Sequence, residues 1–579
     1  MDKRFIIFVI LAAAILIITP RLFPPPVAPL PAGSTADSAL VATSPESSAA
    51  ASARAVDTPV ATTLVPTPPT AAVAESLSAA AVKADTIKVV GSKATYSFST
   101  VGAVPLGVEL HGYQALSGPD GPVQMARTGV PLMEYELLRA SGDTVRLDRL
   151  PFTVDSTTAP GHELPTLTFR TNAGGTAVAI SYTFSPDSYL VRVRGKVEVP
   201  GAGPRYLLVR LPRGLNSQEA DTTDDQRHLA YVVKQTGEDA ESAPFNKLDT
   251  TEVRTENGPL DWVATKSKYF VLGMLTDSTT GPFSGVVLRG LPYEGKVETN
   301  ATAVVLEPVG QQGDFAFDVY AGPQEWRRLL ALGNDFDHVN PYGGFFQRIV
   351  QPFATIVMRI LLWTHDHLQI NYGWVLVIFG VVVRLILWPL NQSAMRSSLK
   401  MQRIQPELQA LQKKYKGTPE KQQAEIMKLY KEHGMSPFSP LAGCLPMLIP
   451  MPVLFALYFV FQNTIEFRGV SFLWMMDLSL KDPYYILPIV MGISMFVLSW
   501  IGLRSSPPNA QAKMMAYFFP VMMTVFFLNL AAGLNLYYAV QNIAALPQQW
   551  LIARERAKVG PVSTPPSPAT ATRTGARTG

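Results

Sequence analysis

Five long apolar segments in the C-terminal part of the chain constrain its fold more than any other feature. Each has close to the roughly 20 residues that an α-helix needs to cross a bilayer. Lipid offers no partner to backbone polar groups, so spanning segments of this length are expected to be helical. A helical membrane bundle is therefore predicted, and the short turn Ala531-Ala532-Gly533 predicts a hairpin of the last two helices. The segments lie at approximately 371–390, 441–462, 484–502, 514–530 and 532–552.

The N-terminus predicts one more membrane segment, which makes six. A basic start, Met1 to Arg4, precedes an apolar run from Phe5 to Ile18, and positive charge before such a run keeps the N-terminus in the cytoplasm. The run is short enough to be the core of a cleavable signal peptide, but no small-x-small cleavage site follows promptly. We therefore expect an uncleaved anchor over residues 1–23. Residues 24–84, rich in Ala, Pro, Ser and Thr, predict a disordered linker.

The distribution of charge predicts how these segments are oriented. Loop 391–440 holds nine Lys or Arg residues against four Asp or Glu, and the tail after residue 552 is also basic. Cytoplasmic loops carry an excess of Lys and Arg, so loop and tail belong on the cytoplasmic side. With six spans, both termini are cytoplasmic, and the region between the anchor and the bundle is exported.

Residues 85–340 predict an all-β domain with the organisation of a sandwich. From Tyr189 to Val199 valines alternate with charged residues, as in a strand with one buried face. Several short strands with turn signals between them are typical of two packed sheets. Further strands are expected at Tyr206–Leu211, Tyr269–Leu275, Gly285–Leu291 and Ala303–Val309.

An amphipathic helix is predicted at 345–362, within an interfacial segment that we place at 341–367. Its apolar positions form one stripe, and polar residues lie off it. A helix of this kind beside membrane spans is expected to lie in the plane of the membrane interface. The stripe consists of Phe345, Ile349, Phe353, Ile356 and Ile360.

Arg384 lies inside the first of the five apolar segments. An arginine at the middle of a spanning helix costs about 2.5–3.5 kcal/mol on insertion scales, so such a charge is a functional hypothesis by default. We interpret it as the cation of a water-filled groove open to the cytoplasm. The alternative is that its long side chain reaches the headgroups from near the cytoplasmic end of the span.

The cytoplasmic loop 391–440 predicts a helical hairpin. Ile404, Leu408, Leu411 and Tyr415 have the spacing of a coiled-coil seam. Thr418-Pro419-Glu420 then fits the start of a second helix. A solvated charged loop is the alternative to a basic hairpin that contacts lipid or a nascent chain. The candidate contacts are Arg396, Lys400, Arg403, Lys413 and Lys414.

Several classes of function are not indicated by the sequence. The single cysteine, Cys444, excludes an intramolecular disulfide. His365-Asp366-His367 has no further ligand cluster nearby, so we expect no metal site. No P-loop or Gly-x-Ser-x-Gly pattern is present, and a net charge of +4 is too small to imply nucleic-acid binding. We expect no cofactor, no catalytic residue and no enzyme activity.

A set of short motifs spread over nearly the whole chain resembles the YidC-type insertases of Gram-negative bacteria, within the wider YidC/Oxa/Alb family. They lie in the exported domain, around Arg384, in the cytoplasmic loop and in the later spans. They are Trp262-Val263-Ala264, Tyr269-Phe270, Val319-Tyr320-Ala321-Gly322-Pro323, Val383-Arg384-Leu385-Ile386-Leu387-Trp388-Pro389-Leu390, Met401-Gln402-Arg403-Ile404-Gln405-Pro406, Gly443-Cys444-Leu445-Pro446-Met447-Leu448-Ile449-Pro450-Met451-Pro452, Asp482-Pro483-Tyr484-Tyr485-Ile486-Leu487-Pro488 and Gly533-Leu534-Asn535-Leu536-Tyr537-Tyr538.

The resemblance implies a membrane protein insertase and chaperone of the bacterial inner membrane. It implies a five-helix core at 368–558 with a hydrophilic groove around Arg384, and a periplasmic β-supersandwich. It also implies action on nascent membrane proteins, alone or with the Sec translocon. At Gly380, four residues before Arg384, relatives can carry a polar residue, so the polarity of the groove is less certain here.

Helix position, independently of the resemblance, suggests further groove residues in the last span. By this argument Gln541 and Asn542 are candidates for added groove polarity. In the expected mechanism the apolar part of a nascent segment slides into lipid against the apolar faces of the spans, with Tyr537 and Tyr538 as candidate substrate contacts. A disordered basic tail is expected at 559–579. Additional partners to consider are the ribosome, the signal recognition particle receptor and the phospholipid bilayer.

Two other classes of function remain open at this point. An intramembrane arginine and proline-broken helices also suit a secondary transporter or channel, although no repeat between halves is visible. A membrane-anchored carbohydrate enzyme is the second, because β-sandwiches often bind sugars. The exported domain has only the histidines His111, His162 and His228, and no His–acid constellation is evident.

Overall fold

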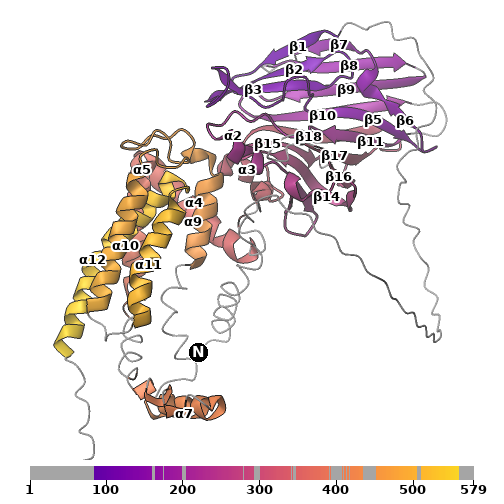
Figure 1. Cartoon of the computed structure of the whole chain (residues 1–579). Coiled ribbons are helices and arrows are strands. Elements are labelled where there is room, and N and C mark those ends of the chain that lie inside the picture. The colour runs from indigo at the N-terminus through magenta and orange to yellow at the C-terminus, as the bar shows by residue number, and fades with distance from the viewer. Residues whose placement is uncertain are drawn as a thin grey trace, which may run out of the picture. The chain divides into compact units, whose positions relative to one another are not determined.

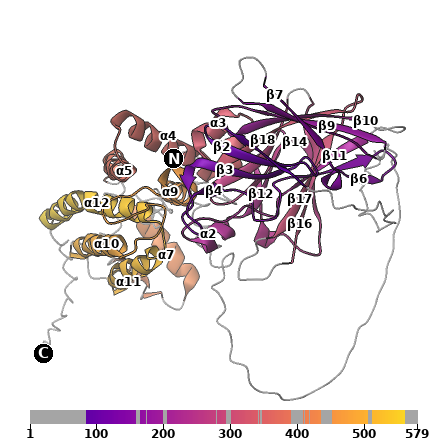
Figure 2. The ribbon, with the colours of Figure 1, turned by 90° about the horizontal axis from the view of Figure 1, so that it is seen from above.

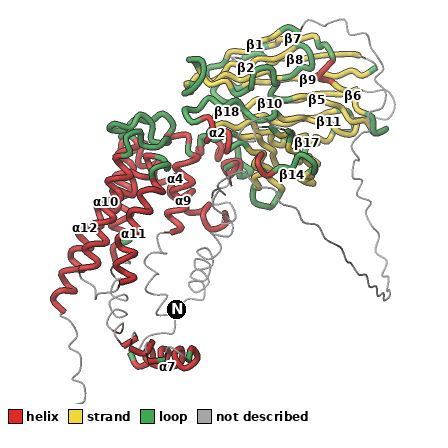
Figure 3. Tube along the Cα trace, in the orientation of Figure 1, coloured by secondary structure: helices red, strands yellow, loops and turns green. Residues whose placement is uncertain are grey.

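The computed structural model describes residues 84–559 with internal gaps, and the predicted all-β domain and helical region are both confirmed. Strands make up the chain from residue 86 to 323, and helices predominate after it (Figure 3). The predicted anchor, almost all of the linker and almost all of the tail lie outside the described residues. The gaps are 159–163, 174, 199–203, 278–279, 293–299, 341, 343–346, parts of 390–417, 434–450 and 505–509.

The strands fall into two antiparallel sheets (Figure 1). They are β1 (Thr86–Val90), β2 (Ala94–Ser99), β3 (Pro105–Gln114), β4 (Pro122–Gln124), β5 (Glu134–Arg139), β6 (Thr144–Arg146), β7 (Thr153–Thr157), β8 (Thr166–Ala173), β9 (Thr176–Phe184), β10 (Leu190–Glu198), β11 (Pro204–Leu211), β12 (Ala230–Gln235), β13 (Glu241–Pro244), β14 (Arg254–Lys266), β15 (Phe270–Thr276), β16 (Phe283–Gly290), β17 (Ala301–Pro308) and β18 (Asp314–Pro323).

The smaller sheet has the order β1-β2-β3-β4. The larger has the order β6-β5-β11-β17-β16-β14-β15-β18-β10-β9-β8-β7, with β12 and β13 branching from β14 (Figure 2). In β10, Val191, Val193 and Val197 are buried while Arg192 and Arg194 are exposed. The period-two pattern read from the sequence therefore corresponds to one face of this strand packed in the core.

Trp262 is buried in the core of the β domain. Its ring is fully buried on β14, its Nε1 donates to the Asn334 carbonyl oxygen at 2.8 Å, and its ring meets Phe336 edge-on at 5.1 Å. The indole donor is thus satisfied, as burial of a tryptophan requires. Gly273 on β15 makes room for Phe336, because a Cβ there would lie 2.4 Å from that ring.

Glu307 is an acid on the buried face of β17. It continues the row of Ala303 and Val305 and has no exposed surface. Neither carboxylate oxygen has a hydrogen-bond partner in the described part of the chain. Burial raises the pKa of Glu307 from its usual 4.5 to about 8; the Asp277 carboxylate adds to this rise, and the backbone of Ala316 opposes it.

Apart from α2, which lies between β11 and β12, the helices follow the last strand in the sequence. They pack as neighbours in the pairs α4 with α9 and α5, α12 with α5, α10 and α9, and α11 with α10. The helices are α2 (Thr222–Arg227), α3 (Trp326–Ala331), α4 (Gln347–Leu368), α5 (Tyr372–Ile386), α7 (Pro419–Glu432), α9 (Met451–Asn463), α10 (Ile486–Arg504), α11 (Ala510–Phe527) and α12 (Ala532–Val559).

The last two helices are joined by the predicted short turn, but the main neighbour of α11 is α10. Near the turn, the Phe527 ring of α11 meets the Tyr538 ring of α12 at 5.3 Å. Gly492 explains the contact of α11 with α10, because a Cβ on it would lie 2.0 Å from the Thr524 hydroxyl of α11. The missing side chain lets the two helices approach closely. The predicted short connection is therefore present, while the extensive packing of α11 is with α10.

Among the described residues, one helix is long and apolar enough by itself to cross a membrane, namely α10. Two apolar helical stretches, Tyr372–Ile386 and Ala516–Phe527, are shorter. Large apolar side chains nevertheless face outward on α5, α10, α11 and α12, as a lipid-facing surface requires. Examples are Val382, Leu385, Ile386, Ile493, Phe496, Phe518, Val521, Val525, Phe526 and Ile543.

Asp482 closes the N-terminal end of α10. It is fully buried; its Oδ1 accepts from Trp474 Nε1 at 3.1 Å and from the Tyr484 amide at 3.0 Å, and its Oδ2 accepts from the Leu487 amide at 2.7 Å. The carboxylate thus satisfies amide donors that the first helical turn leaves free. The aspartate of the Asp482-Pro483 motif therefore caps the N-terminal end of α10.

We predict that Glu307→Gln stabilises the protein at pH 8. Because the folded pKa is raised, the stability linked to Glu307 is fully present below about pH 4.5 and is lost as pH rises towards 8, by up to about 1.4 kcal/mol per pH unit. A neutral glutamine removes this loss. Denaturant unfolding of the full-length protein in detergent at pH 5 and pH 8 measures it. Glu198→Gln, at an exposed carboxylate, is the control, and an unchanged pH slope in Glu307→Gln would contradict the prediction.

We predict that Asp482→Ala lowers the free energy of unfolding by at least about 2 kcal/mol, because it leaves three donors without their acceptor at a buried helix end. Thermal unfolding in detergent, followed by tryptophan fluorescence, measures the change. Lys481→Ala removes the neighbouring exposed side chain and should change stability little. Equal effects of the two substitutions would refute the capping role.

Candidate functional site

Arg384 lies in the last turn of α5, which ends at Ile386. The sequence suggested a position deeper in the span, because the apolar run continues to residue 390. A cation in the last turn is favoured by the partial negative charge at a helix C-terminus. Its neighbours Val381, Val382, Leu385 and Ile386 are exposed apolar residues. A partly buried cation therefore lies beside an apolar outer surface.

A glutamine from the last helix holds this arginine. Arg384 Nη2 donates to Gln548 Oε1 at 2.9 Å, and Gln548 Nε2 donates to the Trp388 carbonyl oxygen at 3.1 Å. Trp388 Nε1 in turn donates to Gln392 Oε1 at 3.2 Å. Gln548 is 2% exposed. The chain of hydrogen bonds joins α5, the segment after it and α12.

The sequence analysis did not predict Gln548 as a polar residue near Arg384, although its spacing from Gln541 indicated such a position. It lies seven residues after Gln541, so both glutamines are two helical turns apart on one face of α12. Polar residues repeated at this spacing in an apolar helix indicate a polar stripe. That spacing does not indicate which residue of α5 Gln548 contacts.

The charge of Arg384 is not neutralised by a carboxylate. None of the ion pairs found among residues 84–559, outside the gaps, involves this side chain, and its buried Nε has no hydrogen-bond partner there. Among the described residues, the Gln548 amide oxygen is the one acceptor of the guanidinium. Arg384 therefore retains donor capacity and a full positive charge for a polar or acidic group that comes near it.

Gly380 brings α5 close to α12. A Cβ at this position would lie 3.1 Å from Val540 Cγ1 and 3.5 Å from the Tyr537 carbonyl oxygen. A larger side chain would require the helices to separate slightly. The residue thus contributes close packing near the Arg384–Gln548 contact, and the polar contribution comes from the opposite helix.

The predicted residues of α12 lie near one another but are differently exposed. Gln541 Nε2 donates to the Tyr537 hydroxyl at 2.6 Å. Tyr537 is 2% exposed and its ring lies 5.7 Å from that of Phe379, while Tyr538 is half-buried against Phe527. Asn542, also half-buried, follows Gln541. A substrate that touches Tyr537 would first have to separate it from α5.

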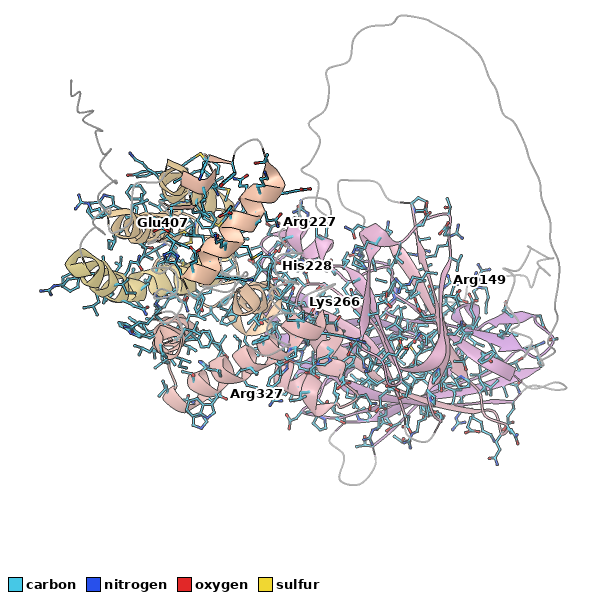
Figure 4. All side chains as sticks on the ribbon, turned by 90° about the horizontal axis from the view of Figure 1, so that it is seen from below. Arg149, Arg227, His228, Lys266, Arg327 and Glu407 are labelled. Atoms are coloured by element: carbon cyan, nitrogen blue, oxygen red, sulfur yellow. The ribbon has the colours of Figure 1, made fainter. Side chains whose placement is uncertain are left out.

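The hairpin predicted for loop 391–440 is described in part. Ile404 is buried, as are Leu429 and Tyr430 of α7, and His433 Nε2 lies 3.8 Å from a Glu407 carboxylate oxygen (Figure 4). Lys414 is exposed, with its Nζ 5.3 Å from the Tyr415 ring centre. Of the other predicted contacts, Arg396, Lys400, Arg403 and Lys413 lie outside the described residues.

The histidines of the segment 365–367 bind backbone carbonyl groups. His365 Nδ1 lies 2.7 Å from the Ile370 oxygen, and its ring stacks on Tyr372; His367 Nδ1 lies 2.9 Å from the Trp363 oxygen. Both residues therefore stabilise the C-terminal end of α4. No group of three potential ligands for a metal ion occurs among the residues that the structure describes.

Two family models match this chain over consecutive regions. The model described as YidC periplasmic domain matches residues 86–356, which contain every strand of the two sheets. The model described as 60Kd inner membrane protein matches residues 363–559, which contain Arg384 and Gln548. The boundary between the matches falls within α4.

Curated relatives are similar over most of the chain. A protein named membrane protein insertase YidC from Chlorobaculum tepidum is 34% identical over 394 residues, covering 64% of this chain and 65% of the relative. The protein of the same name from Chlorobaculum parvum is 32% identical over 446 residues, covering 71% and 73%. The chain thus spans about two thirds of the length of these relatives. A solved structure of an active YidC insertase is 22% identical, with 80% and 92% coverage and a TM-score of 0.33.

We predict that Gln548→Leu costs about 1.5–3 kcal/mol of stability, because it removes the acceptor of a charged guanidinium and frees the Trp388 carbonyl group. Gln541→Leu is the matched control: it removes a bond between neutral groups, worth about 1 kcal/mol. Unfolding in detergent by increasing dodecyl sulfate, read by tryptophan fluorescence, compares the two. Equal losses would argue against a special role for the bond to Arg384.

Proposed function

Because this chain belongs to the YidC family of membrane protein insertases, we propose that it inserts nascent membrane proteins into the bacterial inner membrane and assists their folding. The observation that carries the proposal is Arg384, a partly buried cation that has no carboxylate partner among the described residues and is held by Gln548 beside an apolar outer surface. An intramembrane cation lowers the cost of bringing a polar or acidic segment below the headgroups.

The proposed mechanism is noncovalent. A nascent segment first meets the basic hairpin 391–440, with Arg396, Lys400, Arg403, Lys413 and Lys414 as contacts. Its polar flank then enters a hydrophilic groove near Arg384, with Gln541 and Asn542 as further polar groups and Tyr537 and Tyr538 as contacts. The groove shortens the low-dielectric path that the flank has to cross.

Transfer of the apolar part into lipid drives the proposed reaction. Burial of apolar surface contributes about 25 cal/mol per Å², and the membrane potential contributes about 2.3 kcal/mol per charge per 100 mV. The exposed apolar residues of α5, α10, α11 and α12 give the segment a lipid-facing surface to slide along. No bond is made or broken, so no catalytic group is required.

The proposed architecture has six transmembrane helices, with both termini in the cytoplasm. The anchor is 1–23, the linker 24–84 and the periplasmic β-supersandwich 85–340. The interfacial helix 341–367, the five-helix core 368–558 and the basic tail 559–579 follow. The positive-inside distribution of Lys and Arg supports this orientation.

The proposed partners follow from the kind of client. Small clients need only this protein and the bilayer, whereas larger ones are handed over by the Sec translocon. The ribosome and the signal recognition particle receptor are candidates for the basic hairpin and tail. No contact described near Arg384 favours the hypothesis of a secondary transporter. The described partner of the Arg384 guanidinium is an amide group and not a second titratable group.

We predict that Arg384→Ala slows insertion of a single-span client by roughly ten- to a hundredfold, because it removes a charge-assisted interaction worth about 1.5–3 kcal/mol. Protease protection of the client is measured in liposomes that contain the purified protein and no Sec components. Arg504→Ala is the control: Arg504 ends α10 with its guanidinium over the Trp500 ring at 3.8 Å.

The control variant should insert the client at nearly the wild-type rate. No insertion above empty liposomes by the folded wild-type protein would rule out autonomous activity. Normal insertion by a folded Arg384→Ala variant would remove Arg384 from the mechanism while leaving the family assignment intact.

A further inference from the structure

Helix α4 carries apolar residues on two opposite faces. One face is buried against α9 and α5 through Ala354, Val357, Met358 and Leu361. The other face remains uncovered. An apolar row on the surface of a protein embedded in the inner membrane is most simply covered by lipid. The uncovered row consists of Phe353 (39% exposed), Ile356 (54%), Ile360 (42%) and Trp363 (57%).

An arginine interrupts this uncovered row. Arg359 lies next to Ile360 and one helical turn from Ile356 and Trp363, and it is exposed. Its guanidinium carbon is 5.7 Å from the ring centre of Trp326 on α3, a cation–π contact that orients the side chain. A basic group is thus presented among apolar residues, the arrangement found where a helix meets the headgroup region.

Two hollows adjoin at Arg359. The first, of about 480 Å³, is lined by Trp326, Arg327, Arg359, Ile360, Leu362 and Trp363. The second, of about 660 Å³, extends along α4 towards Arg348 and Asp239. Both contain Arg359 in their walls, and this residue is exposed.

The charges around these hollows leave one cation without a partner. Arg327 of α3 (Figure 4) pairs with Asp366, and Arg348 pairs with Asp239 at 3.2 Å. Arg359 takes part in no ion pair found in the described part of the chain. Its planar fork of donors matches the geometry of a phosphate group.

We propose that Arg359, with Arg327 beside it, binds the phosphate of an anionic phospholipid whose acyl chains cover Ile356, Ile360 and Trp363. The proposal rests on the proposed function only in placing α4 at the membrane, and it does not require insertion activity. A phospholipid fits better than a free phosphate because the site combines one unpaired cation with a continuous apolar row. Neither the cation alone nor the apolar row alone would favour a phospholipid over other ligands.

Lipid contact at this site can be measured through Trp363, whose exposed indole lines the first hollow. The full-length protein is reconstituted in phosphatidylcholine vesicles that contain a minor fraction of brominated lipid. Brominated phosphatidylglycerol is compared with brominated phosphatidylcholine of the same chains. The difference between wild type and Trp363→Phe isolates the signal of this tryptophan.

We expect brominated phosphatidylglycerol to quench Trp363 more than brominated phosphatidylcholine does, and Arg359→Gln to abolish most of the difference. One basic residue near a lipid surface contributes about fivefold in affinity for an anionic lipid, and the quenching curve should shift by that factor. Arg149→Gln, which removes an exposed charge from the β domain, is the control of equal net charge and should leave the difference unchanged.

Equal quenching by the two brominated lipids in the wild type would overturn the proposal. So would an undiminished preference in Arg359→Gln, because the cation would then not be the cause. Loss of the preference on addition of excess inorganic phosphate, at constant ionic strength, would assign a free-anion site instead. The insertion assay is separate: normal insertion without lipid preference refutes this site alone, and lipid preference without insertion rules out autonomous insertion alone.

Discussion

Each backbone polar group that becomes free where an apolar helix ends needs a partner from the protein, because lipid provides none. The helical part of this chain meets the requirement with single side-chain amides and carboxylates. Asp482 receives two amides at the start of α10, and Asn371 receives the Gly373 amide at the start of α5. Asn535 donates to the Phe527 and Leu530 carbonyl groups at the turn between α11 and α12.

Gln548 is also a side chain that satisfies a backbone group at a helix end, and in addition it binds Arg384. Its amide nitrogen satisfies the Trp388 carbonyl group after α5, and its amide oxygen holds Arg384. A structural requirement of the helix end thereby positions the charge that we place at the centre of insertion. The neutral glutamine fixes the orientation of the guanidinium without removing its charge, which a carboxylate would do.

The charge of another buried arginine, Arg468, is neutralised by a buried carboxylate. Arg468 Nε lies 3.0 and 2.8 Å from the two carboxylate oxygens of Glu219, Nη2 donates to the Gln114 carbonyl group, and both charged side chains are about 5% exposed. Burial of such a charge is tolerable only with this degree of pairing. Arg384 and Arg359 lack it, and each lies beside exposed apolar residues. The contrast separates an arginine that holds the structure together from arginines available to a ligand.

Local patterns in the sequence determined the features that belong to one segment. Alternation from Tyr189 to Val199 predicted β10, hydropathy located the helices of the bundle, and a charge within an apolar run singled out Arg384. Periodicity describes which face of one element is buried, so it needs no knowledge of the partner. Pairing across the fold is different, since residues distant in sequence meet only when elements pack.

Only the tertiary structure therefore decided that Gln548 binds Arg384, that α11 packs on α10 at Gly492, and that Arg359 forms no ion pair in the described part of the chain. Glu307 is the same case: a strand was expected at Ala303–Val309, but that its carboxylate has no hydrogen-bond partner among the described residues depends on every neighbouring strand. The physical reason is that hydropathy acts along one element, whereas charge compensation and close packing depend on what the rest of the chain brings near.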